Sequence, residues 1–276
     1  MKVRKYLAFF CLCCITLSAH LAAALAQNSS KQQLAIPLSE PGRPFTLNVD
    51  IISGSIQVTT YGGKEVIIDA VGEENVKSES EAKKGMRRIG GRGLELNVEE
   101  KNNVVRVREG FPNRLSRLTI RIPTATARLK LSTINEGSIT VSNVKGELEI
   151  SDLNGAIVLN AISGSVVANT INGDITVKFK ALNEHAPMAF STLNGNVDVS
   201  FPATIRASFK LKSDQGEIFT DFDLVSDVRR SKVVTSTKAG MYQVKLDDWV
   251  YGRVGGGGQQ VLMKNMNGNI YIRRVK

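Results

Sequence analysis

The sequence has few of the residues that carry out chemistry: three cysteines, two histidines and one tryptophan in 276 residues. The cysteines are confined to Cys11, Cys13 and Cys14, and after His20 the only histidine is His185. Zinc sites and cysteine–histidine catalysis are therefore excluded beyond the amino terminus, and a serine–histidine arrangement would depend on His185 alone. We expect that histidine to be a solvated loop residue.

The first 26 residues have the pattern of a secretory signal. Met1–Lys5 carries three basic residues, the chain from Tyr6 to about Leu21 is apolar or small, and Ala24-Leu25-Ala26 supplies an A-x-A site. This pattern predicts cleavage after Ala26, the alternative being an uncleaved anchor over Tyr6–Ala26. The protein is then exported to the periplasm, the cell surface or beyond, without a lipid anchor. It has no cysteine left for a disulfide there.

Long apolar runs are absent after the signal, so no integral membrane segment is predicted after cleavage. The formal net charge is +10, and loss of the signal removes three basic residues. The remaining excess is concentrated between Lys77 and Lys130, with 14 basic and 6 acidic residues. The densest part of this excess is formed by Lys83, Lys84, Arg87, Arg88 and Arg92. These residues are a candidate patch for binding lipopolysaccharide phosphates, acidic glycans or anionic phospholipid headgroups. The alternative is that they belong to a solvated loop. We predict no nucleic-acid ligand, because the chain is exported and has few stacking aromatics.

The main signal in the sequence is an internal repeat built on glycine. Glycines recur every nine residues from 137 to 173, and successive units that begin at Gly137, Gly155, Gly173 and Gly195 are 18, 18, 22 and 21 residues long. Periods of this kind indicate a solenoid. The predicted structural turn residues are Gly137, Gly146, Asn154, Gly155, Gly164, Asn172, Gly173, Asn194, Gly195, Gly216, Asn267 and Gly268.

Asn-Gly between apolar runs also suits a two-residue hairpin, so an antiparallel meander is the alternative. Apolar residues lie at +2 and +4 from each glycine and next at +7, as in Ile157, Leu159 and Ile162 after Gly155. In one straight strand +7 would face the opposite side, so a bend is required. We therefore predict an all-β, single-stranded parallel β-solenoid with coils of 18–22 residues. Asn154, Asn172 and Asn194 should form a stacked ladder, with positive φ at the adjoining glycines.

The predicted organisation is a signal over 1–26, a leader over 27–44 and one continuous domain over 45–276. Within the domain, residues 45–130 provide strands, irregular first coils and an amino-terminal cap, and residues 131–276 provide the repeats. A hairpin is expected about residues 99–103, between the alternating stretches 94–98 and 104–108.

The phrase Ser191-Thr192-Leu193-Asn194-Gly195-Asn196-Val197-Asp198-Val199 resembles the repeats of the bacterial putative-adhesin domain family. Leu118–Pro123 is similar to the family's lead-in, and Gly255–Gly258 with the following Asn267-Gly268 is similar to its ending. The resemblance covers roughly residues 45–276. It implies an exported, β-helix-like protein that acts in adhesion or envelope interaction, without catalytic residues to carry over.

Two other functions remain open at this point. Asp221/Asp223 and Asp247/Asp248 could act as acid–base pairs in a β-helical carbohydrate-active enzyme. Export without an anchor also suits a periplasmic scaffold or sensor partner of an envelope-stress system. A calcium-binding β-roll is disfavoured because only Gly173 is followed by aspartate. We predict no metal and no cofactor.

Overall fold

The computed structural model describes residues 30–72, 96–110, 116–135, 137–183, 186–227, 232–238, 241–247 and 249–275. Every regular element within these ranges is a β-strand, which confirms the predicted all-β class. No helix in these ranges is long and apolar enough to cross a membrane. The predicted signal peptide lies outside them.

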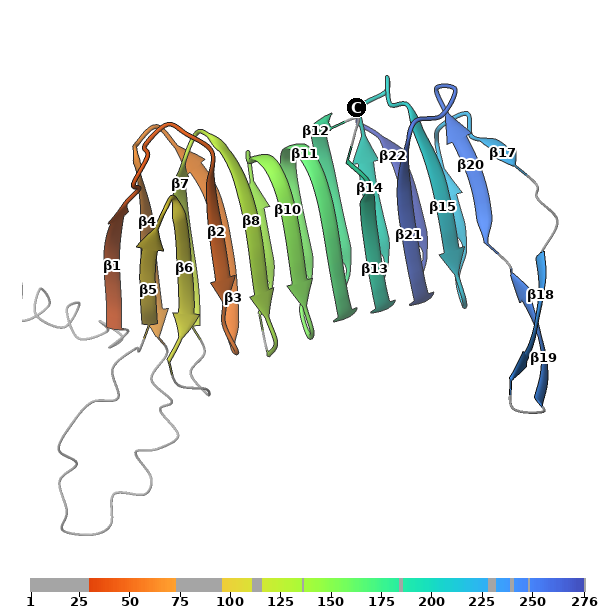
Figure 1. The fold of residues 1–276 in the computed structure, drawn as a ribbon, viewed down its shortest axis with the longest axis horizontal. Coiled ribbons are helices and arrows are strands. Elements are labelled where there is room, and N and C mark those ends of the chain that lie inside the picture. Colours follow the sequence, from red (N-terminus) through yellow and green to blue (C-terminus); the bar gives the residue numbers. More distant parts are fainter. Residues whose placement is uncertain are drawn as a thin grey trace, which may run out of the picture.

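Most strands belong to two ladders, which we call ladder A and ladder B, and neighbours within each ladder pair in parallel (Figure 1). Ladder A runs in the order β6 (Val104–Glu109), β2 (Phe45–Asp50), β8 (Thr126–Thr133), β10 (Lys145–Asp152), the second part of β11 (Ile157–Asn172), β13 (Met188–Asn194), β21 (Gln259–Asn267) and β15 (Ala207–Ser213).

Ladder B consists of the strands that follow these in the chain. Its order is β7 (Ser116–Pro123), β3 (Gly54–Tyr61), β9 (Ile139–Ser142), the first part of β11, β12 (Ile175–Leu182), β14 (Val197–Phe201), β22 (Ile270–Arg274) and β16 (Ile218–Thr220). One strand of ladder A with the next of ladder B makes a rung. β11 belongs to both ladders because it bends at Ala161, whose φ is 53°.

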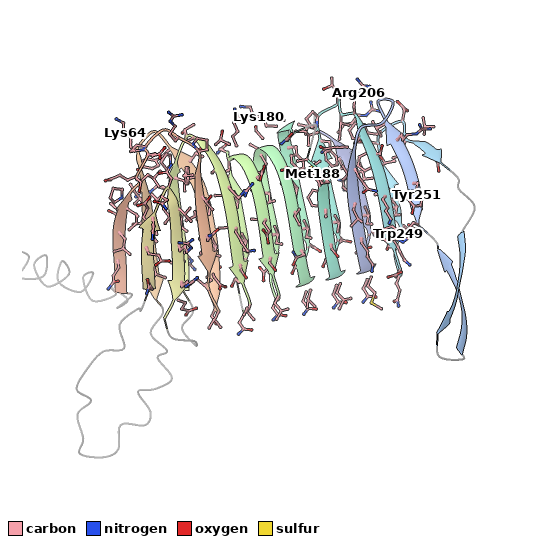
Figure 2. The ribbon with its side chains drawn as sticks, viewed as in Figure 1. Lys64, Lys180, Met188, Arg206, Trp249 and Tyr251 are labelled. Atoms are coloured by element: carbon pink, nitrogen blue, oxygen red, sulfur yellow. The ribbon has the colours of Figure 1, made fainter. Side chains whose placement is uncertain are left out.

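Antiparallel strands extend the ladders, so the sheet as a whole is mixed. At the amino-terminal end β4 (Glu65–Gly72) and β1 (Ser30–Pro37) follow β7, and β5 (Leu96–Lys101) forms the predicted hairpin with β6. At the other end β20 (Val250–Val254) and β17 (Val225–Asp227) follow β15. There Figure 2 labels Trp249, and Lys210 Nζ lies 4.4 Å from the centre of its ring. The predicted parallel pairing therefore holds among the repeats but not at the ends.

A separate hairpin, β18 (Lys232–Lys238) and β19 (Met241–Asp247), is paired only with itself in the described part of the chain. It lies in sequence between β17 and β20, and Figure 1 shows it projecting from the carboxy-terminal end of the stack.

The rungs are not stacked in chain order, which the sequence did not predict. The last rung, β21 with β22, is inserted between β13–β14 and β15–β16. Likewise β2 with β3 lies between β6–β7 and β8–β9, so this part of the expected irregular first coils is regular. Insertion gives a rung a neighbour on each side, so both edges of its strands are hydrogen-bonded.

The core lies between the ladders and is built from stacked rows of β-branched residues. The residue two after the turn glycine is buried in rung after rung, and the residue two further on is buried as well. Phenylalanines fill the carboxy-terminal half, where the Phe179 and Phe201 rings stack at 5.4 Å. The first row contains Ile56, Ile139, Ile157, Ile175, Val197 and Ile270.

The asparagines at one corner form a chain of side-chain amides. Asn172 Nδ2 donates to Asn154 Oδ1 at 2.8 Å, Asn194 Nδ2 to Asn172 Oδ1 at 2.7 Å, and Asn267 Nδ2 to Asn194 Oδ1 at 2.7 Å. Asn172 and Asn194 thus both donate and accept between rungs, and the chain continues to Asn267 because its rung is inserted beside that of Asn194.

The glycines beside these asparagines are required for a different reason than the one predicted. Gly195 and Gly268 have positive φ (150° and 131°), but Gly155 and Gly173 do not, so the prediction of positive φ is wrong there. Instead the rungs approach so closely that a Cβ on Gly155 would overlap the carbonyl oxygen of Gly137. The same overlap with the adjacent rung's glycine recurs at the other members of the row, Gly137, Gly173, Gly195, Gly216 and Gly268. At the opposite corner Gly146 and Gly164 combine positive φ with such an overlap.

Side-chain donors satisfy the carbonyl groups of this glycine row. Thr170 Oγ1 donates to the Gly155 carbonyl at 3.1 Å and Thr192 Oγ1 to the Gly173 carbonyl at 2.9 Å. The same bond is made by Thr133 to Gly54, Asn265 to Gly195 and Ser213 to Gly268. Each of these five pairs of adjacent rungs is thereby linked by one side-chain hydrogen bond in addition to the backbone pairing of the strands.

Asp152 occupies the same place in the rung between those of Thr133 and Thr170. It is buried, and its Oδ2 has no hydrogen-bond partner among the described residues. Asp152 Oδ2 and the Gly137 carbonyl oxygen both lie close to Gly155. Ser213 Oγ and the Gly268 carbonyl oxygen lie close to Gly216 in the same way. Burial raises the pKa of Asp152 to about 6, against the opposing effect of the Asn154 and Leu153 N–H groups. A proton on Oδ2 would restore the missing donor.

We expect Gly155→Ala to destabilise the fold by about 1–3 kcal/mol, because the new methyl group forces two rungs apart. Urea unfolding of the purified protein measures this loss. Gly62→Ala is the matched control, since a Cβ there meets nothing within 4 Å. Equal stability of the two variants would contradict the close approach of the rungs.

Asp152 should make stability depend on pH in the direction opposite to that of an ordinary carboxylate. Its folded pKa of about 6 is above the value of roughly 3.9 expected for the unfolded chain. Its stabilising contribution is therefore complete below about pH 4 and is lost as pH rises through about 6. Asp152→Asn keeps a donor at every pH, so we expect this variant to exceed the native protein in stability by about 1–2 kcal/mol at pH 8, and not at pH 4.

Unfolding curves between pH 4 and 8 test this, with Glu147→Gln as an exposed control. Parallel pH profiles for the Asp152→Asn variant and the native protein would show that the carboxyl group is not buried in this way.

Candidate functional site

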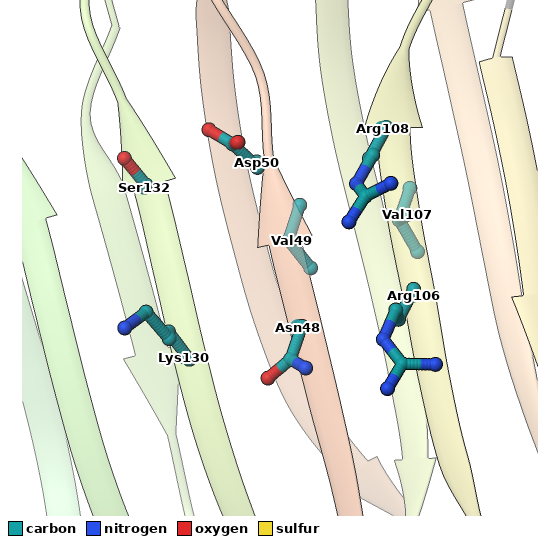
Figure 3. A pocket seen from close by; sticks show the side chains of 8 residues that line it. All are labelled: Asn48, Val49, Asp50, Arg106, Val107, Arg108, Lys130 and Ser132. Carbon is teal, nitrogen blue, oxygen red and sulfur yellow. The ribbon is translucent and has the colours of Figure 1, made fainter.

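A depression on the outer face of ladder A, near the amino-terminal end of the stack, gathers basic and polar side chains (Figure 3). It has a volume of about 280 Å³ and is formed by three adjacent strands, β6, β2 and β8. Figure 3 shows Arg106 and Arg108 on one side, Lys130 on the other, and Asn48 and Asp50 between them. Val49, Val107 and Ser132 complete the lining.

Strand alternation explains why these side chains face outward. In β6 the residues Val105 and Val107 are buried, so Arg106 and Arg108 point to the opposite face. The parallel register then sets the outward residues in two rows across the strands. One row is Arg106, Asn48 and Lys130, and the other is Arg108, Asp50 and Ser132.

The depression carries three cationic groups against the single carboxylate of Asp50. Arg106 Nη1 lies 3.5 Å from Glu99 Oε1, and Lys130 Nζ lies 2.8 Å from Glu149 Oε1. Both are exposed pairs, which contribute at most about 1 kcal/mol, so an incoming anion can replace them at little cost. Within the described ranges, Arg108 has no ion pair.

The chemistry of this arrangement is recognition of anions. Guanidinium groups bind phosphate, sulfate and carboxylate oxygens through paired N–H donors, and a lysine adds a point charge. Asn48 and Ser132 can bind hydroxyl groups next to the charge, and Asp50 can accept from them. Among the described residues, no group of three or more His, Cys, Asp or Glu side chains could hold a metal ion.

The structure does not test the basic patch that was singled out from the sequence. Lys83, Lys84, Arg87, Arg88 and Arg92 lie outside the described residues, as does His185. The depression was missed because its three strands are brought together by the stacking of rungs out of chain order. Alternation in 104–108 and 127–131 indicated which side chains face outward, but not which strands are neighbours.

The candidate acid–base pair Asp221/Asp223 makes structural contacts at the carboxy-terminal end of the stack. Asp221 Oδ1 accepts the Arg274 N–H at 2.8 Å, and Asp223 Oδ2 lies 3.2 Å from Arg274 Nη2. Both carboxylates are thus tied to one arginine. Of the second pair, Asp247 ends β19 and Asp248 lies outside the described residues.

Comparison with solved structures finds similar proteins at low sequence identity. One is a putative cell adhesion protein from Clostridium sporogenes, with 11% identity over 90% of this chain and 100% of that protein, and a TM-score of 0.45. Another is a putative adhesin from Bacteroides fragilis, with 10% identity over 90% and 99% of the two chains and a TM-score of 0.37. A third is a putative lipid-binding protein from Parabacteroides distasonis, with 11% identity over 91% and 98% and a TM-score of 0.31. No curated protein matches the chain.

The family model described as Toastrack DUF4097 matches residues 46–273, from the first rung strand to the last. This range is nearly the one over which the repeats resemble the putative-adhesin domain family, and that resemblance is confirmed. The chain belongs to the Toastrack DUF4097 family.

Proposed function

We propose that the protein is a non-catalytic, exported interaction protein that binds anionic groups of the cell envelope through the depression on ladder A. The observation that carries this proposal is the convergence of Arg106, Arg108 and Lys130 across three strands. The ligand class is a polymer or lipid with repeated phosphate, sulfate or carboxylate groups, such as an acidic glycan or lipopolysaccharide.

The architecture suits display of a binding surface better than turnover of a substrate. Parallel rungs with buried rows of side chains make a stiff, extended β-solenoid that holds outward groups at the strand spacing of about 4.8 Å. The depression is open to solvent, so part of a longer polymer can enter it. Its location near the amino-terminal end agrees with the basic excess between residues 77 and 130, which adds long-range attraction for anions.

Export and the envelope location are part of the same proposal. They are supported by the basic, apolar and A-x-A segments of residues 1–26, and by the confinement of all cysteines to that segment. A protein held together by backbone pairing and core packing is independent of disulfides, which suits an oxidising compartment.

The triple variant Arg106→Gln/Arg108→Gln/Lys130→Gln tests the site. We expect its affinity for heparin or lipopolysaccharide micelles to fall at least about tenfold, and the salt dependence of binding to become shallower. Calorimetric titration at two salt concentrations measures both quantities.

Lys178→Gln/Lys180→Gln/Lys264→Gln removes the same charge from other exposed strands and is the matched control; Lys180 lies at the upper edge of the stack in Figure 2. Equal losses in the two triple variants would mean that net charge, and not the depression, attracts the ligand. A loss confined to a variant with residues 83, 84, 87, 88 and 92 all changed to glutamine would assign the site to that segment.

A further inference from the structure

The carboxy-terminal end of ladder B differs from the other three ladder ends. At those ends an antiparallel strand follows the last parallel one: β4 after β7, β5 after β6, and β20 after β15. Ladder B instead stops at β16, which pairs with β22 and with no other strand in the described part of the chain. A rung strand itself therefore forms the edge here.

The backbone of β16 presents hydrogen-bonding groups at this edge. Ile270 N–H donates to the Glu217 carbonyl at 2.9 Å and Asp221 N–H donates to the Ile272 carbonyl at 3.3 Å, which fixes the alternation along the strand. The N–H and C=O groups of Ile218 and Thr220 consequently point away from β22. They are placed where the next strand of the ladder would bind.

The side chains beside this edge are acidic and aromatic. Phe219 is 43% exposed, and its ring stacks on that of Tyr271 in the neighbouring strand at 5.3 Å with an interplanar angle of 12°. Since the two rings are stacked from strand to strand, the other face of Phe219 is directed beyond the end of the ladder. Glu217 and Asp221, two residues before and after Phe219, are exposed and have no ion pair among the described residues.

The segment that contains β16 carries an excess of negative charge. Residues 214–227 contain five carboxylates and no lysine or arginine, in a protein whose net charge is +10. Two of the five are neutralised, Asp214 by Lys212 and Asp223 by Arg274. The local excess of negative charge would repel anionic ligands and attract cationic ones.

On the neighbouring strand, an arginine of the chain itself contacts the same combination of groups, an aromatic ring and a carboxylate. The Arg273 guanidinium carbon lies 4.8 Å from the centre of the Tyr271 ring, and its Nε lies 2.9 Å from both oxygens of Asp198. An aromatic ring next to a carboxylate on the outer face of ladder B is thus suited to an arginine. Phe219 with Glu217 and Asp221 repeats this combination at the open edge, where no arginine of the described chain fills it.

We propose that β16 binds an extended basic segment of a partner protein as one further strand of ladder B. Backbone pairing with Ile218 and Thr220 supplies the alignment, one lysine or arginine lies over Phe219, and basic residues two positions away pair with Glu217 and Asp221. This surface is at the opposite end of the stack from the anion-binding depression, so it goes beyond the proposed function and can succeed or fail independently of it.

The probe is a capped nine-residue peptide in which lysine alternates with valine or threonine. We expect the purified full chain to bind it, and Phe219→Ala to weaken binding at least about fivefold. Glu217→Gln/Asp221→Asn should weaken it at least about tenfold, with unchanged melting temperature. Glu40→Gln/Glu65→Gln removes the same charge at the other end of the stack and should bind as the native protein does.

Two further peptides separate backbone pairing from charge alone. The same peptide with a methyl group on every backbone nitrogen keeps its charge but has no strand donors in either direction of pairing, so it should lose binding, and so should a glutamate version. Equal binding by the N-methylated peptide, or undiminished binding by the Phe219→Ala variant, would overturn strand addition at β16. So would sedimentation showing that the native chain self-associates and that Phe219→Ala abolishes this, because the edge would then be occupied by a second copy.

Discussion

The structure depends on the closeness with which one rung lies on the next at the asparagine–glycine corner. Strand pairing alone fixes the spacing between rungs, but at this corner the backbone turns away from both ladders and its carbonyl groups need other partners. Glycine lets two turns approach until no Cβ would fit, and a threonine, serine or asparagine from the next rung then reaches the glycine carbonyl. Exposed side-chain hydrogen bonds through Asn172 and Asn194 also link these corners from rung to rung. A repeated phrase in the sequence thus corresponds to a repeated set of hydrogen bonds.

This constraint also explains how rungs from distant parts of the chain can lie side by side. A rung with the same corner phrase fits against any other, whatever its position in the sequence. The copy at Asn267-Gly268 accordingly stacks on the copy at Asn194-Gly195, although about seventy residues separate them, and its Asn265 donates to the Gly195 carbonyl. The copy that follows Asn194-Gly195 in the chain has Gln215 in place of asparagine, and its rung is the outermost one at the carboxy-terminal end. Placing both β2–β3 and β21–β22 inside the stack gives each of these rungs two paired edges.

The sequence predicted the strands, the repeat unit and the asparagine ladder, because each depends on residues that are close in the chain. Side-chain parity around Gly155 required a bend, and β11 does bend at Ala161. What the sequence could not supply was the order of the rungs, since identical corner phrases are compatible with several orders. The depression depends on that order: Arg106 and Lys130 flank Asn48 only because β2 lies between β6 and β8. The positive φ expected at Gly155 was wrong for a related reason, namely that a glycine needed for a close approach looks the same in sequence as one needed for its dihedral angle.

The depression and the segment that ends ladder B differ in the sign of their charge, although the neighbouring strands β15 and β22 also carry lysine and arginine. The amino-terminal rungs carry arginines and lysines on their outer face, while the segment that ends ladder B carries carboxylates around an exposed ring. The two proposals together imply that one anionic and one cationic partner bind at separate places on the same stack. An edge strand of only three residues, Ile218–Thr220, limits uncontrolled pairing, and the flanking carboxylates restrict what can add to it. The same features that keep this edge from aggregating therefore also define the chemistry of the segment it can accept.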